Sequence, residues 1–224
     1  MTLAAIADAE QQSEVTYRAI RSDILFGRLP PGSKLKLERL RGDYGTSIST
    51  LREILSRLSS ERFVVAEGQR GFQVAPISPI DLQESAELRL LLETHALAAS
   101  FARGDLDWES RVVAAHHKLT VMERRLSDGD TSALAAWKQY DWQFHQSLIS
   151  ACGSSLLMRT HATAFDRYLR YQMIALGYRG DIAIEEHCHL RDSALARNAP
   201  KAAEILDRHV RGGVAHALAM GAIG

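Results

Sequence analysis

The sequence has few cysteines and no long uncharged apolar segment. Its 224 residues include only Cys152 and Cys188, which are too few for a framework of disulfides. No run of about 18 uncharged apolar residues occurs, so we expect no membrane-spanning helix. The N-terminus has no basic segment before an apolar one and carries Asp8, Glu10 and Glu14, which argues against a signal peptide. We therefore expect a cytoplasmic protein that does not bind a membrane.

An excess of charge of one sign is also lacking, because Lys plus Arg and Asp plus Glu each number 27. The two parts of the chain nevertheless differ. Residues 10–78 carry 11 basic and 8 acidic side chains, whereas residues 79–224 carry 16 basic and 18 acidic ones. A mildly basic first part favours contact with nucleic acid at that end. Histidine is missing before His95, so a metal-dependent function would belong to the second part.

Helical spacing and turn residues divide residues 10–78 into short elements. We expect helices at residues 14–26, 36–43 and 48–59 and strands at 63–66 and 72–75. Gly45 suits the tight turn between the second and third helices, and Ser47 suits the N-cap of the third. A helix-turn-helix at about residues 37–56 followed by a two-stranded hairpin is typical of a winged helix-turn-helix domain.

Polar residues on the outer side of the third helix are the candidates for contact with DNA. Short hydroxyl side chains let the backbone approach phosphates, and Arg52 can reach a guanine edge or a phosphate. A lysine before the motif and the tip of the hairpin could reach neighbouring phosphates. The candidate DNA-binding residues are Lys36, Ser47, Ser49, Thr50, Arg52, Gln69, Arg70 and Gly71. A merely solvated helix face is the alternative, but the hairpin and the basic charge favour DNA binding.

Beyond residue 78 the hydrophobic pattern is helical throughout. We expect helices at residues 79–102, 105–127, 131–151, 154–176, 181–197 and 200–219. Residues 79–219 therefore form an all-α bundle. The fold class is mainly α, with a winged helix-turn-helix followed by this bundle.

One helix of the bundle carries polar residues on its buried face. Trp137, Asp141, His145 and Leu148 share one side of the helix expected at 131–151. An internal hydrogen bond between the aspartate and the histidine would satisfy the pair. His187 and His209 lie on the inner faces of two further expected helices, so the alternative is a transition-metal site with one carboxylate and three imidazoles. Zn²⁺ is the preferred ion, with Ni²⁺ and Mn²⁺ as alternatives.

A basic residue faces the same interior. Arg89 shares a helix face with Glu93, and a buried arginine needs an anion. Glu93 could supply that anion within the protein, or a small organic acid could bridge the metal and Arg89. Arg170 is a further candidate for binding a second carboxylate. The candidate effector-binding residues are therefore Arg89, Glu93 and Arg170.

Two segments resemble a known family. Pro31-Gly32, Leu51-Arg52-Glu53-Ile54-Leu55, Gly68 and Arg70-Gly71 resemble the DNA-binding domain of the GntR family of bacterial transcriptional regulators. Ile48 stands where that family commonly has a base-contacting arginine, so base recognition there must differ. Residues 80–219 resemble the FCD ligand-binding domain of the FadR branch, a bundle of six or seven helices, through Arg89-Leu-Leu-Leu-Glu93, Asp141-Trp-Gln-Phe-His145, Glu186-His187 and His209.

The resemblance implies a metal and an effector. In metal-containing members the ligands fall at Asp141, His145, His187 and His209. Parts of the sequence are similar to carbon-starvation-induced regulators of glutarate and γ-aminobutyrate use, which implies a small dicarboxylate effector. The hypothesis is a homodimeric regulator, a repressor, that binds a pseudo-palindromic operator in double-stranded DNA and responds to an organic acid. The alternatives are a metal-dependent hydrolytic enzyme and a DNA-binding protein whose metal is purely structural.

Overall fold

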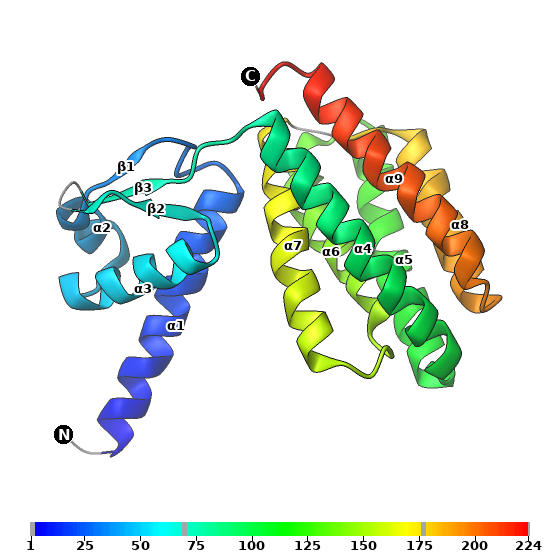
Figure 1. The fold of residues 1–224 in the computed structure, drawn as a ribbon, viewed down its shortest axis with the longest axis horizontal. Helices are drawn as coiled ribbons and strands as arrows, with labels where there is room; N and C mark the ends of the chain where they lie inside the picture. Colours follow the sequence, from blue (N-terminus) through cyan, green and yellow to red (C-terminus); the bar gives the residue numbers. More distant parts are fainter. Residues whose placement is uncertain (1–2, 69–70, 176–177, 224) are drawn as a thin grey trace. The chain divides into compact units, whose positions relative to one another are not determined.

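A computed structural model of the chain describes residues 3–68, 71–175 and 178–223. The chain forms two compact units, Met1–Ile77 and Ser78–Gly224, here called the head unit and the body unit. The head unit combines helices with a small sheet, and the body unit is helical (Figure 1). This architecture confirms the expected fold class.

The described residues of the head unit form three helices and three short strands. They are α1 (Leu3–Leu25), β1 (Lys34–Leu35), α2 (Leu37–Tyr44), α3 (Ile48–Ser60), β2 (Val64–Ala66) and β3 (Phe72–Val74). The sheet is antiparallel with the order β1-β3-β2. The expectation of a two-stranded hairpin was wrong in one respect, because Lys34 and Leu35 pair with Gln73 and Phe72. A two-residue strand is too short to show alternation in a sequence.

The turn between α2 and α3 has the expected chemistry. Gly45 adopts a left-handed conformation with φ of 62°, which closes α2. Ser47 caps α3, since its Oγ accepts a hydrogen bond from the Thr50 amide at 3.1 Å. Both predictions are confirmed. Because the turn and the cap fix where α3 begins, they also fix which of its side chains face solvent.

The buried face of α3 anchors that helix in the head unit. Its buried residues are Leu51, Ile54, Leu55 and Leu58, and they belong to a cluster with Ile20, Ile24, Phe63 and Val74. The leucines alone are worth about 1.5–3 kcal/mol each when fully buried. The opposite face, with Ser49 and Arg52, remains exposed. The packing therefore presents the candidate DNA-binding side of α3 to solvent.

The body unit is a bundle of long helices. They are α4 (Pro79–Arg103), α5 (Leu106–Ser127), α6 (Leu134–Ile149), α7 (Ser155–Ile174), α8 (Asp181–Leu195) and α9 (Ala199–Ala219), with a 3₁₀ turn at Thr131–Ala133 before α6. The expected helices are present, with ends displaced by a few residues. The expected end at residue 176 lies outside the described residues. Among the described residues, no helix is both long and apolar enough to cross a membrane.

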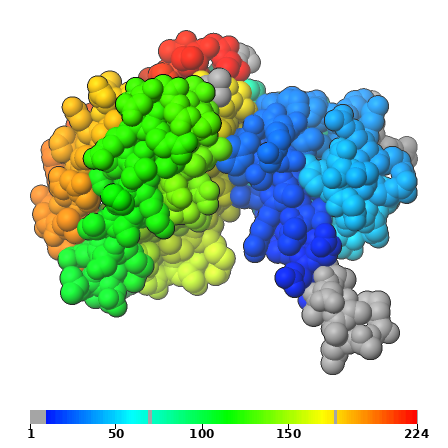
Figure 2. Space-filling view, turned by 180° about the vertical axis from the view of Figure 1, so that it is seen from behind, coloured from blue at the N-terminus to red at the C-terminus, as the bar shows by residue number. Residues whose placement is uncertain are grey.

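The packing of the bundle arranges the helices α4 to α9 around one interior. α4 contacts α6, α7 and α9, and α5 contacts α6 and α8. Figure 2 shows α5, in bright green, and α8, in orange, on one face of the body unit. Trp108, Phe144 and Phe165 are fully buried between the helices. The polar residues described next lie within this apolar surround.

Candidate metal and effector site

The structure brings the four predicted metal ligands together. Asp141 and His145 come from α6, His187 from α8 and His209 from α9, and all four are buried. One candidate ligand atom from each lies within 4.8 Å of those of the other three. Ligands of a tetrahedral ion with bonds of about 2.0–2.1 Å lie roughly 3.3 Å apart, so a small inward movement of these side chains would complete such a site.

A glutamate holds each of the three histidines from the side away from this centre. His145 Nδ1 lies 2.5 Å from Glu93 Oε1, His187 Nδ1 lies 2.6 Å from Glu123 Oε1, and His209 Nδ1 lies 2.9 Å from Glu186 Oε2. An ionised carboxylate can only accept, so each imidazole donates its Nδ1 hydrogen. Nε2 is then the ring nitrogen that faces a cation, an arrangement that carboxylates bound to metal-ligating histidines give in metal proteins. A cation would have to displace the Arg89 guanidinium, whose Nη2 lies 3.2 Å from His145 Nε2.

His187 gives the clearest test of whether a cation fits. Its Nε2 is buried and has no hydrogen bond of good geometry among the described residues, although Asp141 Oδ1 lies 3.2 Å away. Burial lowers the pKa of His187, but Asp141 and Glu123 outweigh it and raise that pKa to about 9. The two carboxylates thus favour positive charge at this point. A divalent cation would supply it, so the donor set fits a metal ion.

The other ligands have the protonation states that a cation requires. Burial lowers the pKa of His145, and it lowers the pKa of His209 further, so both imidazoles stay neutral. Burial favours the neutral form of Asp141, but Lys138 and His187 outweigh it and hold its pKa well below the usual range. One carboxylate and neutral imidazoles are therefore available as ligands.

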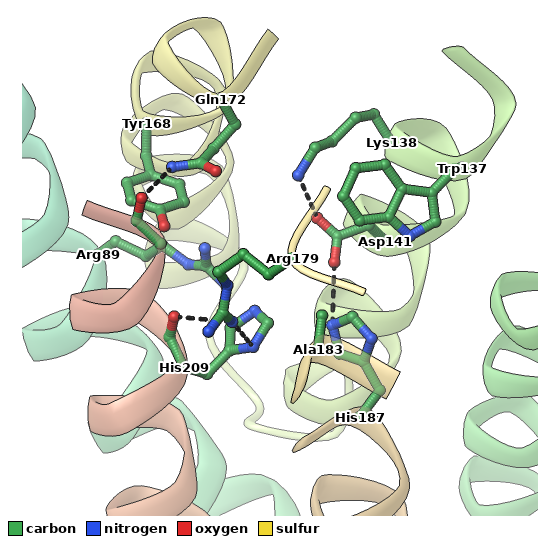
Figure 3. Close-up of a pocket in the computed structure, with 11 residues that line it drawn as sticks. Arg89, Trp137, Lys138, Asp141, Tyr168, Gln172, Arg179, Ala183, His187 and His209 are labelled. Atoms are coloured by element: carbon green, nitrogen blue, oxygen red, sulfur yellow. Dashed lines mark hydrogen bonds and ion pairs between the residues drawn. The ribbon is translucent and has the colours of Figure 1, made fainter. Parts of the chain in front are cut away.

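A small cavity adjoins three of the four candidate ligands, Asp141, His187 and His209. It has a volume of about 20 Å³, enough for a single water-sized group. Arg89, Lys138 and Arg179 reach it from α4, from α6 and from the segment before α8 (Figure 3). Tyr168 and Gln172 line it from α7. Gly213 on α9 lies so close to the Tyr168 hydroxyl that a Cβ there would clash with it, so the glycine allows α7 and α9 to approach each other. Three basic side chains therefore line the same cavity as three of the candidate metal ligands, an arrangement that favours negative charge in the cavity.

Arg89 pairs with Glu93, which was one of the two possible anions considered for it from the sequence. Its Nε lies 2.9 Å from Glu93 Oε2, and its guanidinium stacks 4.1 Å from the centre of the Phe165 ring. Glu93 also accepts from His161, whose Nε2 is 3.0 Å from Oε2. Burial raises the pKa of Glu93, but Arg89 and His145 outweigh it and hold that pKa well below the usual range. Because Arg89 also lines the cavity, the pair orients it without removing it from the pocket.

The structure places Arg170 elsewhere. It is buried on α7, two residues away from both Tyr168 and Gln172, and its charge interacts with Asp81 and Tyr171. Arg170 therefore lies near the start of α4, where Asp81 is located. The structure does not bring Arg170 together with Arg89 and Glu93 beside the cavity.

Several pocket residues are not among those predicted from the sequence. Lys138 precedes Asp141 by three residues, so helical spacing could have placed it on the same face. Arg179 lies outside any helix, and no periodic signal marks it. The glutamates that hold His187 and His209 could not be paired with them, because periodicity gives the buried face of a helix but not the helix it meets.

The candidate DNA-binding residues gather at the start of α3. Ser47 Oγ lies 2.7 Å from Ser49 Oγ and 2.9 Å from Thr50 Oγ1, so the three hydroxyls form one cluster at the helix N-terminus. Arg52 and Lys36 are exposed. Gly71 is half-buried and directly precedes β3, and Gln69 and Arg70 lie outside the described residues. A helix N-terminus with a cluster of hydroxyls suits phosphate contact.

Comparison with known proteins matches both units. Residues 12–74 match the gntR family of bacterial regulatory proteins, and residues 84–212 match the FCD domain. The chain is 36% identical to the HTH-type transcriptional regulator BphR of Paraburkholderia xenovorans, over 93% of this chain and 86% of BphR. It is 31% identical to the HTH-type transcriptional repressor GlaR of Escherichia coli, over 87% of this chain and 90% of GlaR.

Solved structures share the fold. McbR/YncC of E. coli superposes with a TM-score of 0.77 at 18% identity, covering 93% of this chain and 97% of that protein. A GntR-type regulator from Rhodococcus sp. RHA1 gives a TM-score of 0.75 at 22% identity, covering 94% and 98%. At these identities the likeness concerns the fold alone.

Proposed function

The chain belongs to the gntR family of bacterial regulatory proteins, and from this premise we propose that it is a repressor controlled by a small carboxylate that binds beside a metal ion in its FCD domain. It is a transcriptional regulator of the GntR/FCD type and not the hydrolytic enzyme considered from its sequence. Its likeness to GlaR, which is named a repressor, supports the sign of the response. Its place of action is the cytoplasm, where the operator lies.

Asp141, His145, His187 and His209 would hold the metal ion, with Zn²⁺ preferred and Ni²⁺ or Mn²⁺ as alternatives. A bound ion supplies a Lewis-acid position for an oxygen of the effector. Arg89 faces the same cavity from α4 and provides the charge that attracts a carboxylate. The observation that carries the proposal is this combination of a four-ligand cluster with basic side chains around one buried cavity.

The size of the cavity couples binding to a change of structure. A volume of about 20 Å³ cannot hold a dicarboxylate, so an effector must displace lining side chains to enter. Tyr168, Gln172 and Arg179 belong to that lining. The occupied and empty bundles therefore differ, and an effector shifts DNA affinity to the extent that it binds one arrangement better.

Helix α7 offers a route from the pocket to the start of the body unit. Tyr168 and Gln172 face the cavity, while Tyr171 on the same helix donates to Asp81 Oδ2 at 2.6 Å. The Tyr171 hydroxyl also accepts from the Ser78 amide at 3.3 Å. Ser78 caps α4 and is the first residue of the body unit. Movement of α7 would thus act on the residue that follows the head unit.

The head units of a homodimer would recognise two half-sites of a pseudo-palindromic operator. In each head unit Ser47, Ser49 and Thr50 would contact phosphates, and Arg52 would contact a base edge or a phosphate. Lys36 before α2 would add contacts to the DNA backbone, and so would Gln69, Arg70 and Gly71, which the sequence places in the wing.

Operator binding with and without acids tests the proposal. We expect the full chain to bind DNA from upstream of its own gene in a fluorescence anisotropy assay and to release it with one of a panel of mono- and dicarboxylates. Arg52→Ala should weaken DNA binding by about tenfold or more. The control Arg159→Ala changes an exposed arginine of α7 and should bind as the wild type. If acids change neither stability nor DNA binding, the metal is purely structural and the proposal fails.

Tyr171→Phe tests the route through α7. Losing the bond to Asp81 should leave the affinity for a carboxylate within about twofold of wild type, because Tyr171 does not line the cavity. The effect of that acid on operator affinity, about 5- to 150-fold for ordinary coupling, should shrink several-fold. Anisotropy titrations of operator DNA measure it, with Tyr140→Phe on α6 as the control. Unchanged coupling in Tyr171→Phe would exclude this route.

A further inference from the structure

Lys138 occupies an unusual position among the three basic residues of the pocket. Arg179 donates to Glu186 Oε2 at 2.6 Å, and Arg89 donates to Glu93 Oε2 at 2.9 Å. The Lys138 ammonium has Asp141 as its nearest carboxylate, with Nζ 3.6 Å from Oδ2. That distance is longer than a charge-assisted hydrogen bond of about 2.8 Å. Lys138 is therefore the most weakly paired of the three cations.

The partner of Lys138 is also a candidate metal ligand. Glu93 and Glu186 bind their histidines at Nδ1, on the side away from the cation position, so the two arginines keep their partners when the site is filled. Asp141 has no such freedom. Its Oδ1 lies 3.2 Å from His187 Nε2, and its Oδ2 lies 3.6 Å from Lys138 Nζ. Once Oδ1 ligates a cation, the carboxylate shares its charge with that ion, so its attraction for Lys138 weakens and the buried ammonium lies beside a dication.

The Lys138 side chain is buried and cannot place its ammonium group in solvent. The residue is 5% exposed, and its ammonium lies 4.0 Å from the centre of the Trp137 ring. Figure 3 shows its side chain directed into the pocket toward Asp141. A buried positive charge without an anion is costly, so the filled site calls for an anion at the Lys138 ammonium.

We infer that Lys138 binds the anionic group of the effector, and that Asp141 releases it for this role only when a cation occupies the site. This inference deepens the proposed function and rests on it. It names the class of ligand as an organic anion whose carboxylate lies between the cation position and Lys138. It also sets an order, in which the metal-loaded protein is the form that binds the effector.

The first test uses the metal alone. Lys138→Met keeps the length of the side chain and its contact with Trp137 but removes the charge that competes for Asp141. Zn²⁺ should bind this full-length variant about fivefold to tenfold more tightly than wild type, by competition with a fluorescent chelator. Lys138→Arg should bind Zn²⁺ like the wild type. Lys118→Met removes an exposed lysine of α5 and controls for the change in net charge. An unchanged or weaker Zn²⁺ affinity in Lys138→Met would contradict the inference.

The second test uses acetate and glutarate as probes. Tryptophan fluorescence should report binding of one of these acids to the Zn²⁺-loaded wild type, and at least about tenfold weaker binding to the Zn²⁺-free wild type. Lys138→Met loaded with Zn²⁺ should lose about tenfold or more in affinity, whereas Lys138→Arg and Lys118→Met should not. Equal binding by Lys138→Met, or no binding of either acid by the loaded wild type, overturns the inference.

Operator binding separates this inference from the proposed function. If acids bind in a Lys138-dependent way and operator affinity stays constant, the inference holds and the proposed function fails. If an acid releases the operator equally well from wild type and from Lys138→Met, the proposed function holds and the inference fails.

Discussion

Removing the metal ion from the purified protein is expected to lower the unfolding temperature of the body unit by about 10 °C. Binding to the folded state alone stabilises by about 4 kcal/mol when the ion is present at roughly a thousandfold excess over its Kd. The site favours a cation because His187 Nε2 lies 3.2 Å from Asp141 Oδ1 in a buried position where carboxylates stabilise positive charge. Without the ion, a proton on His187 must supply the positive charge that the neighbouring carboxylates favour.

Calorimetry of the full chain, with added Zn²⁺ and with a chelator, measures this effect. All three tryptophans lie beyond residue 100, so their fluorescence follows the body unit alone. Asp141→Asn should abolish the dependence on the chelator. Asp207→Asn, an exposed acid on α9, should keep it. Identical unfolding with and without the chelator, together with no metal in elemental analysis, would remove the metal from the proposal.

The convergence of the four candidate ligands could be predicted from the sequence because each lies on a face that periodicity marks as buried. Asp141 and His145 share the face of Trp137, and an apolar stripe flanks His209. Their convergence follows from the all-α bundle, in which inward faces share one interior. Alternation is a weaker signal in short segments, so β1 was missed although Lys34 and Leu35 complete the sheet.

The glutamates and Arg179 could not be predicted in the same way. Glu123 lies on α5, far in sequence from His187, and only the packing of α5 against α8 makes them neighbours. Arg179 lies outside the helices, and its side chain is positioned by its hydrogen bond to Glu186. The candidate ligands therefore follow from local pattern, whereas the groups that orient them follow from helix packing, which a single sequence does not specify.

Glu93→Gln is expected to destabilise the body unit by about 3–5 kcal/mol. Glu93 is fully buried and serves three partners at once, which are Arg89 at 2.9 Å, His145 at 2.5 Å and His161 at 3.0 Å. A neutral amide leaves the Arg89 guanidinium as an uncompensated buried charge, and it cannot accept from both imidazoles as a carboxylate does. Urea unfolding followed by tryptophan fluorescence measures the loss.

The double variant Arg89→Met with Glu93→Gln distinguishes charge from packing. If the loss comes from the unpaired guanidinium, removing that charge should restore a large part of the stability, and the two substitutions should be strongly non-additive. Glu87→Gln changes an exposed carboxylate on the same helix and should stay within about 0.5 kcal/mol of wild type. Additive losses in the double variant would mean that Arg89 is held by its aromatic neighbours Phe165 and Tyr168 rather than by the glutamate. In that case Arg89 would be a fixed cation of the pocket, available to an anion without any rearrangement of Glu93.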